Sequence, residues 1–155
     1  MCELQDNGVV EEEECDAKWV AEPVLAKSKD TYNKYTFAVD YRALNKNLVK
    51  YQYPLPRVDE NLVVIGGKKI FSRIDIVKAF WSINIPESQR HHTSFRANGK
   101  LYRWERKTFG LKNGSSTFQK CIDKILESLR HLCAIAYIDD ILVFSDTEEE
   151  HLNYL

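Results

Sequence analysis

Two adjacent aspartates, Asp139 and Asp140, interrupt a strongly apolar stretch that reads CAIAYIDDILVFS over residues 133–145. The apolar runs on either side each suit one strand, so the pattern predicts a strand, a two-residue turn at Asp139-Asp140 and a second strand. Aspartate is common in turns, and the pair can simply mark a hairpin tip. However, a tight hairpin usually has glycine at the second turn position, and adjacent carboxylates repel unless a cation lies between them. The pair is therefore either an ordinary turn or a cation site.

A further carboxylate, Asp75, lies near the end of a predicted strand over residues 69–76, where Phe71 and Arg73 share its face. One interpretation is an edge position with the side chain in water. The other is that Asp75 and Asp139-Asp140 meet at the centre of one sheet. Three converging carboxylates suit Mg²⁺, and two such ions about 4 Å apart can activate an attacking hydroxyl and stabilise a leaving pyrophosphate.

The charge of the chain is unevenly distributed. Residues 1–22 hold eight acidic side chains and one lysine, and residues 146–155 hold four acidic side chains and no lysine or arginine. The intervening residues 23–145 therefore carry a net charge of +10. Such a basic segment favours a polyanionic partner, nucleic acid first, although a solvated lysine-rich surface would give the same count. The run of glutamates at 11–14 predicts that residues 1–16 are an acidic disordered leader.

Local patterns place the other elements of the chain. Hydrophobic residues alternate over 35–41 as in a strand, and they recur at helical spacing over 56–65 and 115–130. Asn98-Gly99 between two strand-like runs indicates a hairpin, and Thr147 with Glu150 can form a capping box that opens a last helix. Strands and helices mix without strict alternation, so the fold class is α+β, or a two-layer α/β fold in the loose sense.

Composition excludes several classes of protein. With 155 residues, 44% of them hydrophobic, the chain can bury a core of its own. No apolar run approaches the roughly 20 residues of a membrane span, and the acidic start lacks a secretory signal. The four cysteines, at positions 2, 15, 121 and 133, have no metal-ligand spacing and are expected to be free thiols.

Several sequence blocks resemble those of reverse transcriptases. YIDDILVFS resembles their YxDD hairpin, and FSRIDIVKAFWSINI resembles the strand that carries their first catalytic aspartate. The blocks VDYRALNK, YPLPRVDE, FGLKNGSSTFQK and EEEHL follow the family order. The chain is most similar to the polymerase of gypsy-type LTR retrotransposons, from about Trp19 to Leu155. Blocks in order at family-like spacing are far more specific than a lone YxDD.

The resemblance implies the fingers and palm of a right-hand polymerase, with an antiparallel palm sheet backed by helices and no thumb. The fingers would be residues 17–50 and 86–108, and the palm residues 51–85 and 109–155. It also implies an intracellular, cytoplasmic location in a virus-like particle, with access to the nucleus. The implied partners are dNTPs, an RNA or DNA template with its primer, and the rest of a Gag-Pol-type polyprotein (thumb, ribonuclease H and integrase), with no membrane.

The resemblance also assigns site residues. Asp75, Asp139 and Asp140 would be the catalytic carboxylates, holding two Mg²⁺ or Mn²⁺ ions with the Ile76 carbonyl. The implied nucleotide-binding residues are Lys27, Lys29, Phe80, Phe109 and Gly110, with Phe80 as the steric gate that excludes a ribose 2′-hydroxyl. The implied template and primer residues are Arg42, Asn113, Gly114, Ser115, Ser116 and Tyr137.

The sequence departs from the family pattern at two positions. Thr36 stands where the family usually has an arginine that contacts the triphosphate, and Thr108 stands where a proline often precedes FGL. The leading hypothesis is an RNA-directed DNA polymerase domain. One alternative is a truncated or co-opted retroelement remnant that binds nucleic acid without polymerase activity. Another is an RNA-dependent RNA polymerase, against which Phe80 argues.

Overall fold

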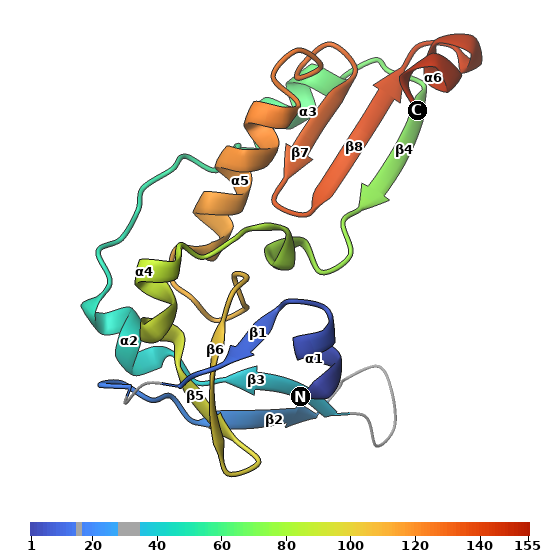
Figure 1. Cartoon of the computed structure of the whole chain (residues 1–155). Coiled ribbons are helices and arrows are strands. Elements are labelled where there is room, and N and C mark those ends of the chain that lie inside the picture. The colour runs from blue at the N-terminus through green and yellow to red at the C-terminus, as the bar shows by residue number, and fades with distance from the viewer. Residues whose placement is uncertain (15–16, 28–34) are drawn as a thin grey trace. The chain divides into compact units, whose positions relative to one another are not determined.

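The computed structural model describes residues 1–14, 17–27 and 35–155. The chain forms two compact units, which are described separately here (Figure 1). Unit 1 comprises residues 1–50 and 80–114, and unit 2 comprises residues 51–79 and 115–155. Within the described part of the chain, no helix is both long and apolar enough to cross a bilayer. Cys2, Cys121 and Cys133 are free thiols, whereas Cys15 lies outside the described residues.

Unit 1 is built on two small antiparallel sheets. The first has the order β1 (Val10–Glu12), β6 (Lys100–Trp104), β5 (Phe95–Ala97), and the second pairs β2 (Pro23–Lys27) with β3 (Tyr35–Val39). The hairpin predicted at Asn98-Gly99 joins β5 to β6, and both turn residues have the expected positive φ. The buried core of this unit consists of Val9, Val10, Ala21, Val39, Tyr41, Ile85, Phe95, Tyr102 and Trp104.

Short helices complete unit 1. They are α1 (Cys2–Asp6), α2 (Arg42–Asn47) and α4 (Glu87–Arg90), with the 3₁₀ turns η1 (Ala79–Ser82) and η2 (His91–Thr93). The Tyr41 hydroxyl donates to the Thr93 carbonyl at 2.7 Å, while the Thr93 hydroxyl accepts from Trp104 N at 3.0 Å. These bonds satisfy polar groups that the core would otherwise bury without partners.

The prediction of a disordered acidic leader over residues 1–16 was wrong for residues 1–14, the part of it that the structure describes. Val9 and Val10 are buried, and β1 pairs with β6 along residues 10–12. Glu11 accepts hydrogen bonds from Arg90 and Arg103, and Glu13 pairs with Arg103. The glutamates do repel one another, but these distant arginines offset the repulsion, a compensation that a local charge count omits.

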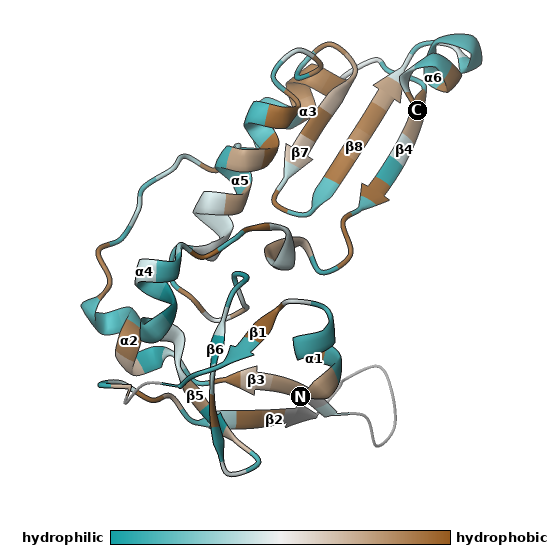
Figure 2. Ribbon diagram, viewed as in Figure 1, coloured by the Kyte–Doolittle hydropathy of each residue, from teal (hydrophilic) through white to brown (hydrophobic). Residues whose placement is uncertain are grey.

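Unit 2 contains one three-stranded antiparallel sheet in the order β4 (Ile70–Asp75), β8 (Asp140–Ser145), β7 (Ala134–Tyr137). Figure 2 shows that β8 is hydrophobic along most of its length and hydrophilic at the end that carries Asp140. The central strand thus contributes to the core and to a polar end of the sheet. The buried hydrophobic residues of unit 2 include Val143 and Phe144 on β8 and Ala134, Ile135 and Ala136 on β7. Cys133, just before β7, and Phe118 and Ile122, on the helix over residues 114–125, are buried as well.

Three helices accompany this sheet: α3 (Val58–Ile65), α5 (Gly114–Ile125) and α6 (Glu148–Tyr154). The α5 helix is shorter than the predicted 115–130. Thr147 caps α6 as expected, because its hydroxyl accepts from Glu150 N. Helix α6 is fixed to the sheet by buried His151, whose ring nitrogens bond the hydroxyls of Ser72 and Ser145 at 2.8 and 3.0 Å.

The two compact units have other boundaries than the predicted fingers and palm, a division of the chain that stays a prediction. Residues 80–85 and 109–114 belong to unit 1, although the sequence placed them in the palm. Ile85 N donates to the Glu105 carbonyl at 2.8 Å, which ties the first segment to the end of β6. The Asn45 side chain bonds Gly110 O and Lys112 N, which ties the second segment to α2. Long-range bonds therefore set these boundaries.

Candidate active site

The three aspartates lie at one end of the unit 2 sheet. Asp75, at the end of β4, is the direct cross-strand partner of Asp140, at the start of β8. Ile76 N donates to the Asp139 carbonyl at 3.0 Å and extends the pairing beyond the strand end. Directly opposed residues of an antiparallel pair have side chains on the same face. The strand register therefore brings Asp75 next to Asp140, while Asp139 is tied to the same strand end through its backbone carbonyl.

The turn itself differs from the prediction by one residue. Tyr137 pairs with Asp140, so the two-residue turn is Ile138-Asp139, and Asp140 belongs to β8. Ile138 has φ of +54°, a conformation that β-branched residues rarely adopt. The Gln119 side chain accepts from Ile138 N at 2.7 Å and donates to the Ala136 carbonyl at 3.2 Å. This tertiary contact favours a turn that local propensity disfavours.

Gln119 is a site residue that sequence reasoning missed. Its side chain is 0% exposed, and it also donates to Asp123 at 2.9 Å. Asp123 in turn accepts from the Tyr53 hydroxyl at 2.8 Å. The network therefore runs from Tyr53 through α5 to the turn between β7 and β8. A lone glutamine beside an apolar helical stripe gives only a weak signal, because most such residues face solvent.

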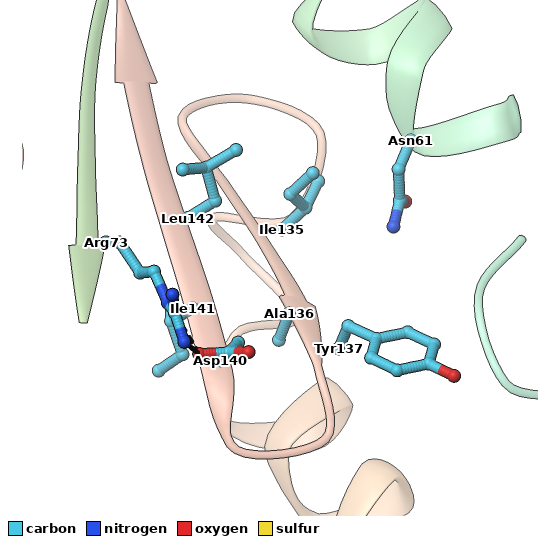
Figure 3. Close-up of a pocket in the computed structure, with 8 residues that line it drawn as sticks. All are labelled: Asn61, Arg73, Ile135, Ala136, Tyr137, Asp140, Ile141 and Leu142. Atoms are coloured by element: carbon cyan, nitrogen blue, oxygen red, sulfur yellow. Dashed lines mark hydrogen bonds and ion pairs between the residues drawn. The ribbon is translucent and has the colours of Figure 1, made fainter. Parts of the chain in front are cut away.

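Arg73 lies among the three carboxylates. Its Nε donates to Oδ1 of Asp140 at 2.8 Å, and Nη2 lies 2.8 Å from the same oxygen. Figure 3 shows the guanidinium reaching from β4 toward Asp140 on β8. The hydrogen bond and charge of Asp140 raise the pKa of the Arg73 guanidinium, and the charges of Asp75 and Asp139 raise it further. Because all three aspartates act on Arg73, the arginine is part of the site's electrostatics.

A cavity of about 300 Å³ adjoins this end of the sheet. Aliphatic side chains of β7 and β8 supply most of its wall, while Arg73, Tyr137 and Asp140 contribute polar atoms (Figure 3). Tyr137 is 44% exposed, so its ring is accessible beside Asp140. The full lining is Asn61, Arg73, Ile135, Ala136, Tyr137, Asp140, Ile141 and Leu142.

The donor set fits a hard divalent cation. Carboxylates and a backbone carbonyl are the ligand types that Mg²⁺ prefers, and Asp75, Asp139, Asp140 and Ile76 supply them at one sheet end. Among the described residues, however, no three acidic, histidine or cysteine side chains form a ready-made metal cluster. The Asp140 carboxylate is instead engaged by Arg73. The residue types therefore suit the metal, while the Asp140 side chain is bonded to an arginine.

The predicted nucleotide-binding residues Phe80, Phe109 and Gly110 lie in unit 1. The rings of Phe80 and Phe109 meet edge to face, with centroids 4.9 Å apart. Phe80 is 9% exposed and Phe109 is 61% exposed. A Cβ at Gly114 would lie 3.2 Å from the Phe80 ring, so glycine permits this close approach. The Phe80 ring is thus buried, and the Phe109 ring that packs against it is accessible.

The remaining predicted contacts have varied surroundings. Arg42 is exposed and pairs with Asp40, and its hydrogen bonds lower the pKa of Asp40 to about 2. Asn113 donates its side-chain amide to Val49 O at 2.9 Å, while Ser115 and Ser116 lie in the first turn of α5. Lys27 ends β2, and Lys29 lies outside the described residues.

Comparisons with known proteins identify the family of the chain. Residues 26–155 match the family model described as reverse transcriptase (RNA-dependent DNA polymerase). The chain is 39% identical over 121 residues to the Pol polyprotein of the Drosophila melanogaster transposon 297, covering 78% of this chain and 11% of that protein. It is 42% identical over 119 residues to the enzymatic polyprotein of cauliflower mosaic virus (strain Strasbourg), covering 77% of this chain and 17% of that protein. It is 33% identical over 138 residues to the Pol polyprotein of the Drosophila melanogaster transposon gypsy, covering 88% of this chain and 13% of that protein. The chain therefore spans less than one fifth of each of these relatives.

Solved structures agree on the fold. A foamy viral protease-reverse transcriptase in complex with double-stranded DNA has a TM-score of 0.82 at 24% identity, covering 97% of this chain and 25% of that one. The native prototype foamy virus protease-reverse transcriptase has a TM-score of 0.81 at 21% identity, covering 97% of this chain and 20% of that one. The predicted α+β class, a polymerase fingers and palm fragment, is confirmed. Because the family model matches most of its length, the chain belongs to the reverse transcriptase (RNA-dependent DNA polymerase) family.

Proposed function

We propose that the chain forms the catalytic part of an RNA-directed DNA polymerase that adds deoxynucleotides to a primer 3′-hydroxyl. The observation that carries the proposal is the register of β4 and β8, which makes Asp75 and Asp140 neighbours and bonds Ile76 to Asp139. Family membership supplies the reaction class. In this proposal residues 17–50 and 86–108 act as the fingers, and residues 51–85 and 109–155 act as the palm.

Asp75, Asp139, Asp140 and the Ile76 carbonyl would hold two Mg²⁺ ions, or Mn²⁺ in their place. When bound, the ions make the primer hydroxyl more acidic and stabilise the charge on the leaving pyrophosphate. The protein's contribution would be to carry the anionic ligands on two hydrogen-bonded strands, so the backbone positions of the ligands are already set. Gln119 keeps the turn that carries Asp139 in place.

The nucleotide and template roles follow the family pattern. Phe80, held against Phe109 and Gly114, would exclude a ribose 2′-hydroxyl, and Phe109 with Gly110 would contact the nucleotide sugar. Lys27 and Lys29 would contact the triphosphate. The residues proposed to contact template or primer are Arg42, Asn113, Gly114, Ser115, Ser116 and Tyr137.

The comparisons suggest the partners. Foamy viral enzymes of the same fold have been solved with double-stranded DNA and with an RNA/DNA hybrid, and the curated relatives are polyproteins. We propose a primer–template duplex and dNTPs as the substrates of this chain, within a polyprotein of the Gag-Pol type.

Primer extension tests the proposal directly. The 155-residue chain is incubated with a labelled DNA primer on an RNA template, dNTPs and Mg²⁺ or Mn²⁺. Asp139→Asn is expected to abolish extension, because a neutral amide is a poor ligand for a hard dication. Asp146→Asn is the matched control, since Asp146 is an exposed aspartate just beyond the opposite end of β8.

The outcomes separate the hypotheses. Extension by the parent and the control, but not by Asp139→Asn, supports the proposed role. Equal extension by parent and Asp139→Asn would contradict it. Salt-sensitive nucleic-acid binding without extension by the parent would instead favour a non-catalytic remnant.

A further inference from the structure

The Arg73–Asp140 pair is placed where stability alone does not explain it. The Arg73 side chain is 69% exposed and that of Asp140 is 43% exposed, so water screens the pair and it stabilises the fold little. Nevertheless two of the three guanidinium nitrogens, Nε and Nη2, each lie 2.8 Å from one carboxylate oxygen. The carboxylate they hold belongs to the predicted metal-binding set.

A guanidinium and a divalent cation would compete for this carboxylate. Both are cations that bind carboxylate oxygens. If the same Asp140 oxygen contacted both at once, the two cations would repel each other, which costs free energy. The described residues include no ready-made cluster of three metal-binding side chains, and Asp140 is turned to Arg73. The arrangement is therefore the one expected of a carboxylate site balanced by an internal cation.

We propose that Arg73 is a positioning residue that occupies Asp140 in the metal-free protein and releases it when the metal ions bind. The inference rests on the proposed metal site. It adds Arg73, which lies on β4 as Asp75 does, to the residues that act at that site. Arg73 offsets the repulsion between the neighbouring carboxylates before the metals arrive. It also lowers the affinity of the site for free divalent cations, because binding must displace it.

Mn²⁺ binding to the 155-residue chain tests this without any activity measurement. Free Mn²⁺ is followed by electron paramagnetic resonance during titration of the parent, Arg73→Gln and Arg73→Lys. Arg73→Gln is expected to bind Mn²⁺ roughly three- to tenfold more tightly, because a competing positive charge is gone. Arg73→Lys should lie between, since it keeps the charge but loses the two-nitrogen contact.

Arg57→Gln is the matched control. Arg57 forms a similarly exposed ion pair with Asp59 in the same unit, with 2.8 Å between the charged atoms. Its removal changes the net charge equally but does not involve the three aspartates. Arg57→Gln is expected to bind Mn²⁺ as the parent does, within about twofold.

Further variants distinguish failure of this inference from failure of the proposed function. If Arg73→Gln binds Mn²⁺ no more tightly than Arg57→Gln, the competition is absent and the role of Arg73 is overturned. If Arg73→Lys matches the parent, charge rather than contact sets the affinity, which also overturns the inference. If Asp75→Asn and Asp139→Asn leave Mn²⁺ binding unchanged, the proposed metal site itself fails.

Discussion

At the scale of single residues, the turn at Ile138-Asp139 depends on one buried side chain. Gln119 bonds the Ile138 amide and the Ala136 carbonyl, while Ile138 keeps a positive φ that an isoleucine rarely adopts. An aspartate on a free loop would sample many positions. The buried amide instead holds the backbone on both sides of the turn, which limits where Asp139 can lie.

Replacing Gln119 with leucine should therefore destabilise the protein. The variant leaves the Ile138 N–H and the Ala136 carbonyl without their side-chain partner, at a cost of about 1–3 kcal/mol in the free energy of unfolding. Urea denaturation measures the loss, and hydrogen exchange at the Ile138 amide should become faster. Gln52→Leu is the control at an exposed glutamine of the same unit and should change stability by less than about 0.5 kcal/mol. Unchanged exchange at Ile138 would contradict the role of Gln119.

Individual site residues were predictable to different degrees. The three aspartates could be found because acidic residues next to apolar strands are unusual, and Arg73 was visible on the face of Asp75. The contact between Arg73 and Asp140 could not be found, because it depends on the register of two strands and joins residues 67 positions apart in the chain. The assignment of Asp140 to a turn failed because Gln119 stabilises an isoleucine in that turn.

At the scale of elements, β1 shows how an acidic segment becomes part of a sheet. Partial burial works against ionised Glu11, but hydrogen bonds and charges from Arg90 and Arg103 keep its pKa below the ordinary value. A lowered folded-state pKa contributes stability above the unfolded-state pKa, near 4.5, and loses it as the pH falls through the folded-state value. The strand is thus an acid-sensitive part of unit 1.

The corresponding variant is Glu11→Gln. At neutral pH we expect a loss of about 1–2 kcal/mol in the free energy of unfolding, since two charge-assisted hydrogen bonds weaken. The difference from the parent should shrink as the pH falls below the unfolded-state pKa near 4.5 and through the lower folded-state pKa, because the parent's Glu11 then becomes protonated as well. Chemical denaturation at several pH values measures this. Glu3→Gln, at an exposed glutamate of α1, is the control, and an equal pH dependence of both variants would refute the assignment.

Elements with strong local signals were predicted well. Asn98-Gly99 determines its hairpin through backbone conformation, and Thr147 determines the start of α6 through a side-chain cap. By contrast, β1 is only three residues long and rich in glutamate, so its strand character comes from pairing with β6. Local sequence cannot report a partner that lies far along the chain.

At the scale of the whole molecule, the acidic start and the basic middle of the chain are not separate. Arg90, Lys100 and Arg103 pair with Glu11, Glu12 and Glu13, so part of the +10 surplus is neutralised within unit 1. The positive charge available to a nucleic acid is therefore smaller than the sequence count.

Deleting residues 1–16 should be far more harmful than removing a disordered tail. The deletion removes Val9 and Val10 from the core and β1 from its sheet, so we expect unit 1 to lose cooperative unfolding. Deleting residues 1–7 removes α1 and spares β1, and should cost less. Thermal unfolding followed by near-ultraviolet circular dichroism compares the two; equal stability of the parent and the longer deletion would show that β1 is dispensable.

The chain passes from one unit to the other after residues 50, 79 and 114, so each unit is assembled from two separated pieces. On a ribosome, β4 emerges well before β8, with which it pairs in the described part of the chain; Arg73 of β4 and Asp140 of β8 are 67 positions apart. Pairing between segments so far apart is slow. During that interval the apolar residues of β4 are exposed, so the segment can aggregate or bind a chaperone. The same pairing that unites Asp75 with Asp140 therefore makes the sheet that carries the proposed site slow to mature.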